Sequence, residues 1–322
     1  MTYLVYLQLA GGFIYLLMGA DLLVRGAVAL ARRTRIAPAV VAFTVVAFGT
    51  SLPELVVSLR AVFTGLPGLV IGNVVGSNIA NVLMVIGAAA LTYPLAKGEG
   101  PVKRDSAMMM AVSVLFVALC LQPELGRGTG LLLLAALVVV GGVMARDATA
   151  SYRTAERGTP VEWALGLPSQ IGMIVVFLVA GLVGLPVGAR LVVQAAAEIA
   201  GQLGVTDVVI GLTIVAFSTS LPELATAVVA ALQRRNDVAV GAVIGSNVFN
   251  ILAIMGLATA VSPSPIPVPP GLRLVDLPLM LGAAVLLTAF VWRDRTIGRK
   301  TGALLTAAYV LYFLALFAGW GR

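Results

Sequence analysis

Long apolar runs recur along the whole chain, and they limit the folds that are open to it. Ten runs have about the 17 to 25 residues needed to cross ~30 Å of hydrocarbon, at residues 4–24, 39–63, 68–93, 107–122, 128–145, 167–190, 205–232, 238–261, 274–292 and 302–320. Every backbone N–H and C=O in lipid needs a partner within the protein, and these runs are too uniformly apolar for barrel strands. The sequence therefore predicts an all-α polytopic membrane protein with ten transmembrane helices.

The charged residues fit this prediction and give the chain a direction. They make up 11% of the 322 residues, against ~25% in soluble domains. The net charge of +7 is spread over short connections rather than gathered in one patch, which argues against nucleic-acid binding. Alternate connections hold 16 of the 21 Lys and Arg residues, so the positive-inside rule predicts that both termini lie outside.

A duplicated pattern divides the chain into two halves. AFGTSLPELVVS at 47–58 precedes GNVVGSNIANVLMVIG at 72–87, and AFSTSLPELATA at 216–227 precedes GAVIGSNVFNILAIMG at 241–256. Equivalent residues such as Glu54 and Glu223 are 169 positions apart, which is the mark of an internal repeat. We predict five-helix repeats at 1–145 and 167–322, joined by a cytoplasmic linker at 146–166. Because five is odd, the second repeat is inverted relative to the first.

Each copy puts a glutamate directly after a proline, well inside an apolar run. A carboxylate near the middle of a bilayer costs roughly 2.5–3.5 kcal/mol on insertion scales, so Glu54 and Glu223 are candidates for a functional site. Pro53 and Pro222 lack an N–H, and their rings clash with the carbonyl four residues earlier. We therefore expect helices 2 and 7 to be broken beside the glutamates. Broken backbone at that depth is tolerated where protein or a polar cavity covers it.

Further oxygen atoms should surround the two carboxylates. The breaks place hydroxyl groups and freed backbone carbonyls near residues 47–51 and 216–220. The following spans carry G-x-x-x-G-S-N, whose small residues permit close helix contact and would bring in Ser77, Asn81, Ser246 and Asn250. An oxygen-only set suits Ca²⁺, whereas Zn²⁺ or Cu calls for Cys or His, and the chain has one Cys and no His. Two glutamates balance one Ca²⁺ and could hold Na⁺ in competition.

With these residues the chain resembles the sodium/calcium exchanger family of the calcium/cation antiporter superfamily, and its prokaryotic ten-helix members in particular. The resemblance rests on G-T-S-L-P-E with G-S-N-I-A-N and on S-T-S-L-P-E with G-S-N-V-F-N. It implies an integral protein of the cell (inner) membrane of a prokaryote. It also implies exchange of Ca²⁺ for Na⁺ by alternating access, in which the first and sixth helices slide past the core.

The resemblance also implies roles for individual residues. Glu54 and Glu223 would bind Ca²⁺ and share in Na⁺ binding, while Asn81 and Asn250 would complete the centre of the site. Backbone carbonyls would come mainly from Ala47, Thr50, Ala216 and Thr219. Hydroxyl groups at flanking Na⁺ sites would come from Ser51, Ser77, Ser220 and Ser246. Some relatives have Asp at the position of Asn250, and because Asn removes a possible third acid, we expect no K⁺ requirement.

Other functions share parts of this pattern. Exchange of Ca²⁺ for H⁺ is the nearest alternative, because a buried carboxylate can carry a proton in place of Na⁺. Two inverted repeats around one closed site argue against a cation channel, and an intramembrane hydrolase with paired acids would not need the surrounding oxygens. We expect a transporter rather than an enzyme, embedded in lipid, without a prosthetic group or an obligatory protein partner.

Overall fold

The computed structural model describes residues 2–95, 100–154, 167–202, 219–293 and 295–317, which are nearly all helical. The longer helices are α1 (Thr2–Thr34), α4 (Leu52–Phe63), α5 (Pro67–Ala80), α7 (Gly100–Leu119), α8 (Arg127–Thr154), α9 (Ile171–Gln202), α12 (Leu221–Leu232), α13 (Asn236–Phe249), α15 (Leu277–Trp292) and α16 (Arg299–Phe317). Shorter helices are α2 (Pro38–Val41), α3 (Ala47–Thr50), α6 (Ile86–Thr92) and α14 (Gly256–Val261). The described residues also form four π-helical segments, η1 (Ala42–Val46), η2 (Asn81–Val85), η5 (Asn250–Met255) and η6 (Leu272–Asp276), and two strands, β1 (Glu124–Leu125) and β2 (Ile266–Pro267).

Most of the predicted spans correspond to continuous apolar helices. Six stretches of the described chain are long and apolar enough to cross a membrane: Tyr3–Thr34, Pro67–Thr92, Arg127–Met144, Ile171–Gln202, Asn236–Val261 and Leu272–Trp292. The bent pair Pro38–Thr50 and Leu52–Phe63 makes a seventh. The three remaining predicted spans contain α7 and α16, which begin with charged residues, and α12, which is short within the described ranges. The helical membrane fold is confirmed, and the count of ten crossings stays a prediction.

The two spans that carry the G-S-N motif form the centre of the protein. Within an apolar stretch of 18 residues in each span, the share of buried residues is 83% for Pro67–Thr92 and 94% for Asn236–Val261, against 17% for Arg127–Met144. Apolar side chains alone do not distinguish a central helix from a lipid-facing one, because lipid is as apolar as a protein core. The small and polar residues of the motif mark the central helices instead.

Several helices extend beyond the apolar runs. α1 continues for ten residues past the predicted end at 24, and Arg25 Nε lies 2.9 Å from the Asp21 carboxylate one helical turn earlier. Such pairs four residues apart stabilise a helix outside lipid. α8 likewise continues to Thr154, so residues 146–154 of the predicted linker are helical, while 155–166 lie outside the described ranges.

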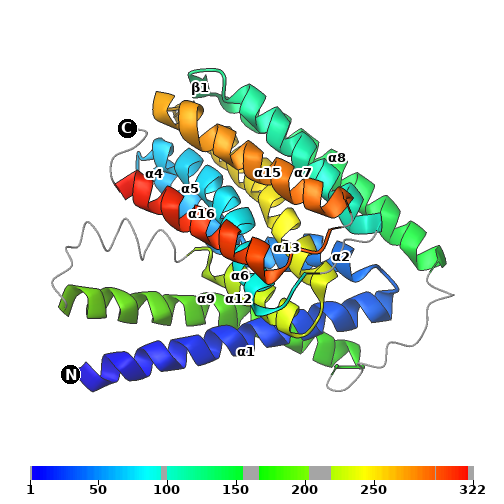
Figure 1. Ribbon diagram of the computed structural model, residues 1–322. Helices are drawn as coiled ribbons and strands as arrows, with labels where there is room; N and C mark the ends of the chain where they lie inside the picture. The colour runs from blue at the N-terminus through cyan, green and yellow to red at the C-terminus, as the bar shows by residue number, and fades with distance from the viewer. Residues whose placement is uncertain (1, 96–99, 155–166, 203–218, 294, 318–322) are drawn as a thin grey trace.

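α1 and α9 lie side by side as a pair, at one side of the other helices (Figure 1). Glycine permits their close approach. A Cβ atom on Gly181 would lie 2.7 Å from the backbone nitrogen of Leu23, and one on Gly188 would lie 2.5 Å from that of Leu16. Any larger residue would force the two helices apart. The pair is therefore packed backbone against backbone.

Two short antiparallel pairings, which we call the two straps, join the loops of the two halves. In one strap β1 pairs with β2, with Leu125 opposite Ile266. In the other, Leu95 and Ile297 exchange both backbone hydrogen bonds at 3.0 Å. All four side chains are buried. β2 and Leu95 each follow a G-S-N span, whereas β1 follows α7 and Ile297 follows α15. Each strap therefore joins a loop after a G-S-N span to a loop after α7 or α15 of the other half. The same arrangement occurs twice, with the halves exchanged.

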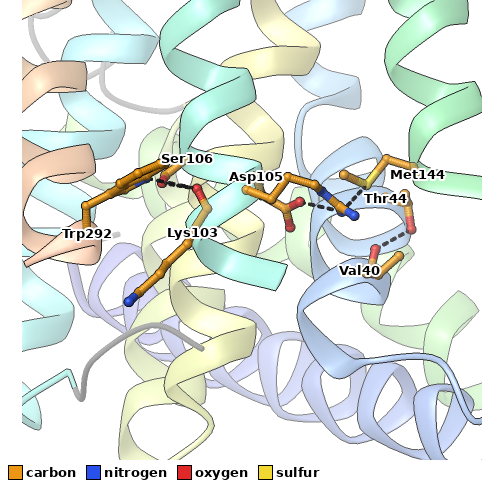
Figure 2. Close-up of polar contacts among 8 residues, drawn as sticks. Val40, Thr44, Lys103, Asp105, Ser106, Met144 and Trp292 are labelled. Carbon is orange, nitrogen blue, oxygen red and sulfur yellow. Dashed lines mark hydrogen bonds and ion pairs between the residues drawn. The ribbon is translucent and has the colours of Figure 1, made fainter. Parts of the chain in front are cut away.

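The first turns of α7 are held between α15 and α8. Figure 2 shows Trp292 of α15 on one side, where its Nε1 donates to the Lys103 carbonyl at 3.1 Å. On the other side, Nη2 of Arg104 lies 2.8 Å from the carboxylate of Asp105 and 3.9 Å from the Met144 sulfur of α8. Asp105 is fully buried, and the ion pair offsets the cost of burying its charge. These contacts fix the position of α7 along its own axis.

Candidate cation site

The break predicted in span 2 lies at Ser51, between α3 and α4. Ser51 has φ −87° and ψ 5°, and the two helical parts meet at a bend of 44°. Pro53 lies in the first turn of α4, where a missing N–H costs no helical hydrogen bond. Ser220 adopts the same conformation before α12, with φ −88° and ψ 0°. Residues 203–218, the first part of predicted helix 7, lie outside the described ranges.

The two glutamates lie in the first turns of α4 and α12, and side chains from the two copies meet around them. Ser51 Oγ donates a hydrogen bond to Glu223 Oε1 at 3.2 Å. The Thr50 hydroxyl also interacts with Glu223, and the Thr219 hydroxyl interacts with Glu54. Glu54 is 2% exposed and Glu223 is 5% exposed, and their charges repel each other. Residues 172 positions apart therefore form one acidic cluster.

Several oxygen atoms of the predicted ligands lack a hydrogen-bond partner among the described residues. They are Oε2 of Glu54 and of Glu223, Oδ1 of Asn81 and of Asn250, and Oγ of Ser246. A buried polar atom left without a partner costs about 1–3 kcal/mol. A hard cation would satisfy such atoms, since Ca²⁺ takes six to eight oxygen ligands. The donor set has the chemistry of a site for a group 1 or group 2 cation.

Asn81 and Asn250 each begin a π-helical segment, η2 and η5. In η2 the N–H of Ile86 bonds to the Asn81 carbonyl, five residues earlier. Such wide turns are rare in proteins overall, and those that occur often lie at functional sites. The two segments start at equivalent positions of the two copies. The sequence did not predict them, because no pattern of residue types separates a single π-turn from an α-helix.

Asn78 and Asn247, the asparagines of the two G-S-N triplets, pair with the predicted ligands Asn250 and Asn81. Asn81 Nδ2 donates to Asn247 Oδ1 at 3.0 Å, and Asn250 Nδ2 donates to Asn78 Oδ1 at 3.5 Å. Both acceptors are almost fully buried. Neither asparagine was among the ligands predicted from the sequence. A signal was present, because buried asparagines at matched positions of two apolar helices require partners.

The expectation that the break frees the Ala47 carbonyl is wrong. This carbonyl accepts the Ser51 N–H at 3.1 Å and the Thr50 hydroxyl at 3.3 Å. The helical hydrogen bonds continue as far as the N–H of Ser51, and Pro53 removes only a bond that comes later in the chain. One lone pair of the Ala47 oxygen still accepts a regular helical bond, as it would in an unbroken helix.

The other predicted ligands lie in or next to the same region. Ser77 is 6% exposed, Ser220 is 4% exposed and Ser246 is fully buried, and all three lie on the central helices or at the break before α12. Ala216 lies outside the described ranges. The second G-x-x-x-G makes the close contact that was predicted for it, because a Cβ on Gly245 would lie 2.7 Å from the Ala47 Cβ.

Comparisons with known proteins agree with this architecture. The chain matches the family described as sodium/calcium exchanger protein over residues 4–144 and 173–318. It is 34% identical to inner membrane protein YrbG of Escherichia coli, over 95% of this chain and 94% of YrbG. It is 32% identical to sodium/calcium exchanger MaX1 of Methanosarcina acetivorans, over 97% and 98% of the two chains. A solved structure of the sodium-calcium exchanger NCX_Mj aligns with a TM-score of 0.82 at 30% identity, covering 98% of this chain and all of that one.

The fold and these matches define an integral membrane protein of the antiporter class, with prokaryotic relatives. The chain belongs to the sodium/calcium exchanger family.

Proposed function

We propose that this protein exchanges Ca²⁺ for Na⁺ at a site built on Glu54 and Glu223. The observation that carries the proposal is the hydrogen bond between Ser51 and Glu223, at 3.2 Å. It joins the broken part of one copy to the acid of the other, so that two carboxylates share one buried cluster. Two acids so close together and so deeply buried can both be ionised only when a positive charge lies beside them.

The proposed ligands fall into three groups. Glu54, Glu223, Asn81 and Asn250 would bind Ca²⁺ at the centre, where each of the four has an oxygen atom without a partner among the described residues. Hydroxyl groups at flanking Na⁺ sites would come from Ser51, Ser77, Ser220 and Ser246. Thr50, Thr219, Ala47 and Ala216 would add backbone carbonyls, and the Ala47 carbonyl would do so in place of the hydrogen bond that it accepts from the Thr50 hydroxyl. The net charge of −2 is balanced either by one Ca²⁺ or by Na⁺ ions, so the two cations exclude each other.

The proposed mechanism is alternating access between inverted repeats, 1–145 and 167–322, with a cytoplasmic linker at 146–166 and both termini outside. The two straps support the inverted repeats, since they are equivalent pairings with the halves exchanged. The packing of α1 against α9 supports the proposal that these two helices move together, because they form one packed unit at the side of the central helices (Figure 1). Sliding of that pair would open the site first to one face and then to the other.

The direct test uses purified protein in proteoliposomes. Vesicles loaded with Na⁺ and diluted into Na⁺-free buffer at equal pH should take up ⁴⁵Ca²⁺, and vesicles with K⁺ in place of internal Na⁺ should not. Uptake driven by a pH gradient alone would favour Ca²⁺/H⁺ exchange, the alternative on the same fold. Flux that needs no counter-ion and does not saturate would favour a channel.

We predict that transport needs no K⁺. Asn250 stands where an ionised acid could supply the additional negative charge that a co-transported K⁺ would need. Initial rates of Na⁺-driven ⁴⁵Ca²⁺ uptake should be the same within error with K⁺ or with choline in the Ca²⁺ solution. The matched variant Asn250→Asp tests the reason, because only that variant should gain K⁺ stimulation. A strict K⁺ requirement in the unaltered protein would contradict the prediction.

A further inference from the structure

The asparagines of the candidate site form two hydrogen-bonded series that cross between the halves of the protein. In the first, Asn81 Nδ2 donates to Asn247 Oδ1 at 3.0 Å, and Asn247 Nδ2 lies 3.6 Å from the Met109 sulfur. All three residues are at most 3% exposed. Asn81 and Met109 belong to the first half, and Asn247 belongs to the second.

The second series has the same order with the halves exchanged. Asn250 Nδ2 donates to Asn78 Oδ1 at 3.5 Å, and Asn78 Nδ2 lies 3.8 Å from the Met280 sulfur. Met109 is on α7 and Met280 is on α15, and both are buried. A contact that recurs between equivalent helices of a duplicated fold points to a shared task rather than to chance packing.

The chemistry of the last member gives each series a direction. A thioether sulfur accepts a hydrogen bond weakly and has no hydrogen to donate, whereas an amide has an NH₂ end and a carbonyl end of similar shape. Met109 therefore favours the orientation in which Asn247 turns its NH₂ toward the sulfur and its oxygen toward Asn81. That oxygen in turn requires the NH₂ end of Asn81. The Oδ1 of Asn81 is left to face away from the series, and it has no partner among the described residues.

We propose that Asn247 and Asn78, each backed by a methionine sulfur, are positioning residues that hold the carbonyl oxygens of Asn81 and Asn250 toward the cation. The inference rests on the proposed function, and it adds residues that do not themselves contact the ion. A rotated amide would present an NH₂ group to Ca²⁺ and would both lose a ligand and repel the cation. Because the amides are buried, no bulk water is available to replace the lost acceptor.

Two structural features hold Met109 and Asn247 of the first series in position. The start of α7 is fixed by Trp292 and Met144 (Figure 2), so Met109 is held about one and a half turns further along the same helix. Gly245 lets α13 pack against Ala47, which sets the position of Asn247 two residues later. The amide orientation is thus coupled to the packing of the central helices.

The test is a double-mutant cycle on equilibrium ⁴⁵Ca²⁺ binding to the purified full-length protein. Asn247→Ala should weaken Ca²⁺ binding by about 10-fold, the loss of one directed hydrogen bond together with one well-oriented ligand. A carboxylate at position 81 has an oxygen at both ends, so orientation ceases to matter there. In the Asn81→Asp background the same Asn247→Ala change should alter affinity by less than about 2-fold.

Further variants separate positioning from packing. Met109→Leu keeps the volume but removes the acceptor, and it should weaken Ca²⁺ binding by about 2-fold to 3-fold. Met108→Leu, next to it on α7, is the control and should bind like the unaltered protein. If Asn247→Ala does not fold, this methionine pair decides the question in its place.

The outcomes distinguish this inference from the function beneath it. Equal losses from Asn247→Ala in both backgrounds, or identical binding by Met109→Leu and Met108→Leu, would overturn the positioning role. Absence of Na⁺-sensitive ⁴⁵Ca²⁺ binding in the unaltered protein would instead overturn the proposed exchange. A large loss from Asn247→Ala in the unaltered background and a small loss in the Asn81→Asp background, together with Na⁺-sensitive binding by the unaltered protein, supports both.

Discussion

Replacing Glu223 with glutamine is expected to lower Ca²⁺ affinity by about 100-fold or more and to abolish Na⁺-driven Ca²⁺ uptake. The change keeps the shape of the side chain but removes one of two buried charges. Breaking a buried charge pair on one side costs about 3–5 kcal/mol, and each ~1.4 kcal/mol is a factor of ten in affinity. Glu54→Gln should behave alike, because the two residues occupy equivalent positions in the two repeats. Equilibrium ⁴⁵Ca²⁺ binding and uptake into Na⁺-loaded proteoliposomes measure both effects.

The same substitution should not destabilise the cation-free protein. Without a cation, burial and mutual repulsion make it costly to ionise both carboxylates of the wild type, so a neutral glutamine at one position removes a cost or leaves it unchanged. The unfolding temperature in Ca²⁺-free detergent should stay the same or rise, while the increase on adding Ca²⁺ should disappear. Glu198→Gln is the matched control, since Glu198 is exposed near the end of α9 and bonds to Gln202. Binding of Ca²⁺ by Glu223→Gln at wild-type affinity would remove Glu223 from the site.

Gly245→Ala is expected to cause the second large effect, through packing rather than charge. The new methyl group would lie 2.7 Å from the Ala47 Cβ and would also meet the backbone of Phe43. Neither neighbour can rotate away, because both atoms are attached directly to the helix backbone. Overpacking of this kind costs about 1–3 kcal/mol or more. Because Gly245 lies next to Ser246 and two residues before Asn247, the displacement should also weaken Ca²⁺ binding.

Thermal unfolding in detergent and ⁴⁵Ca²⁺ binding together measure the effect of Gly245→Ala. Gly142→Ala is the control for the loss of a glycine from an apolar helix. Gly142 is exposed on α8, and no described atom lies within 4 Å of an added Cβ. The control should leave both unfolding and binding unchanged, or raise stability slightly through helix propensity. A Gly245→Ala protein that unfolds and binds like the control would show that α13 can move away from α3 at no cost.

Much of the fold follows from the sequence because lipid imposes strict conditions. Apolar length predicted the helices, and the proline before Glu54 predicted a bend that the structure places at Ser51. The duplicated acids predicted that residues of the two halves would meet, as Ser51 and Glu223 do. The helix ends were less predictable, since α1 continues beyond the apolar run with its own Asp21–Arg25 pair.

The fine geometry of the candidate site could not be predicted in the same way. The π-turns at Asn81 and Asn250 depend on how the central helices pack, and the same residues would also fit an α-helix. Ala47 keeps its helical hydrogen bond because the break begins later than the proline rule suggests. The partners of Asn78 and Asn247 lie on helices of the other half, so local sequence patterns do not identify them.

The two straps also bear on how a protein of this kind can arise. Each strap needs one loop from each half, so neither half alone can form even one of them. A single five-helix ancestor would have left two short backbone edges unpaired. It could have satisfied both edges by assembling with a second copy inserted in the opposite direction. If the protein arose by fusion of two such copies, contacts between chains would have become contacts within one chain, and each half would be free to diverge only where the other half does not depend on it.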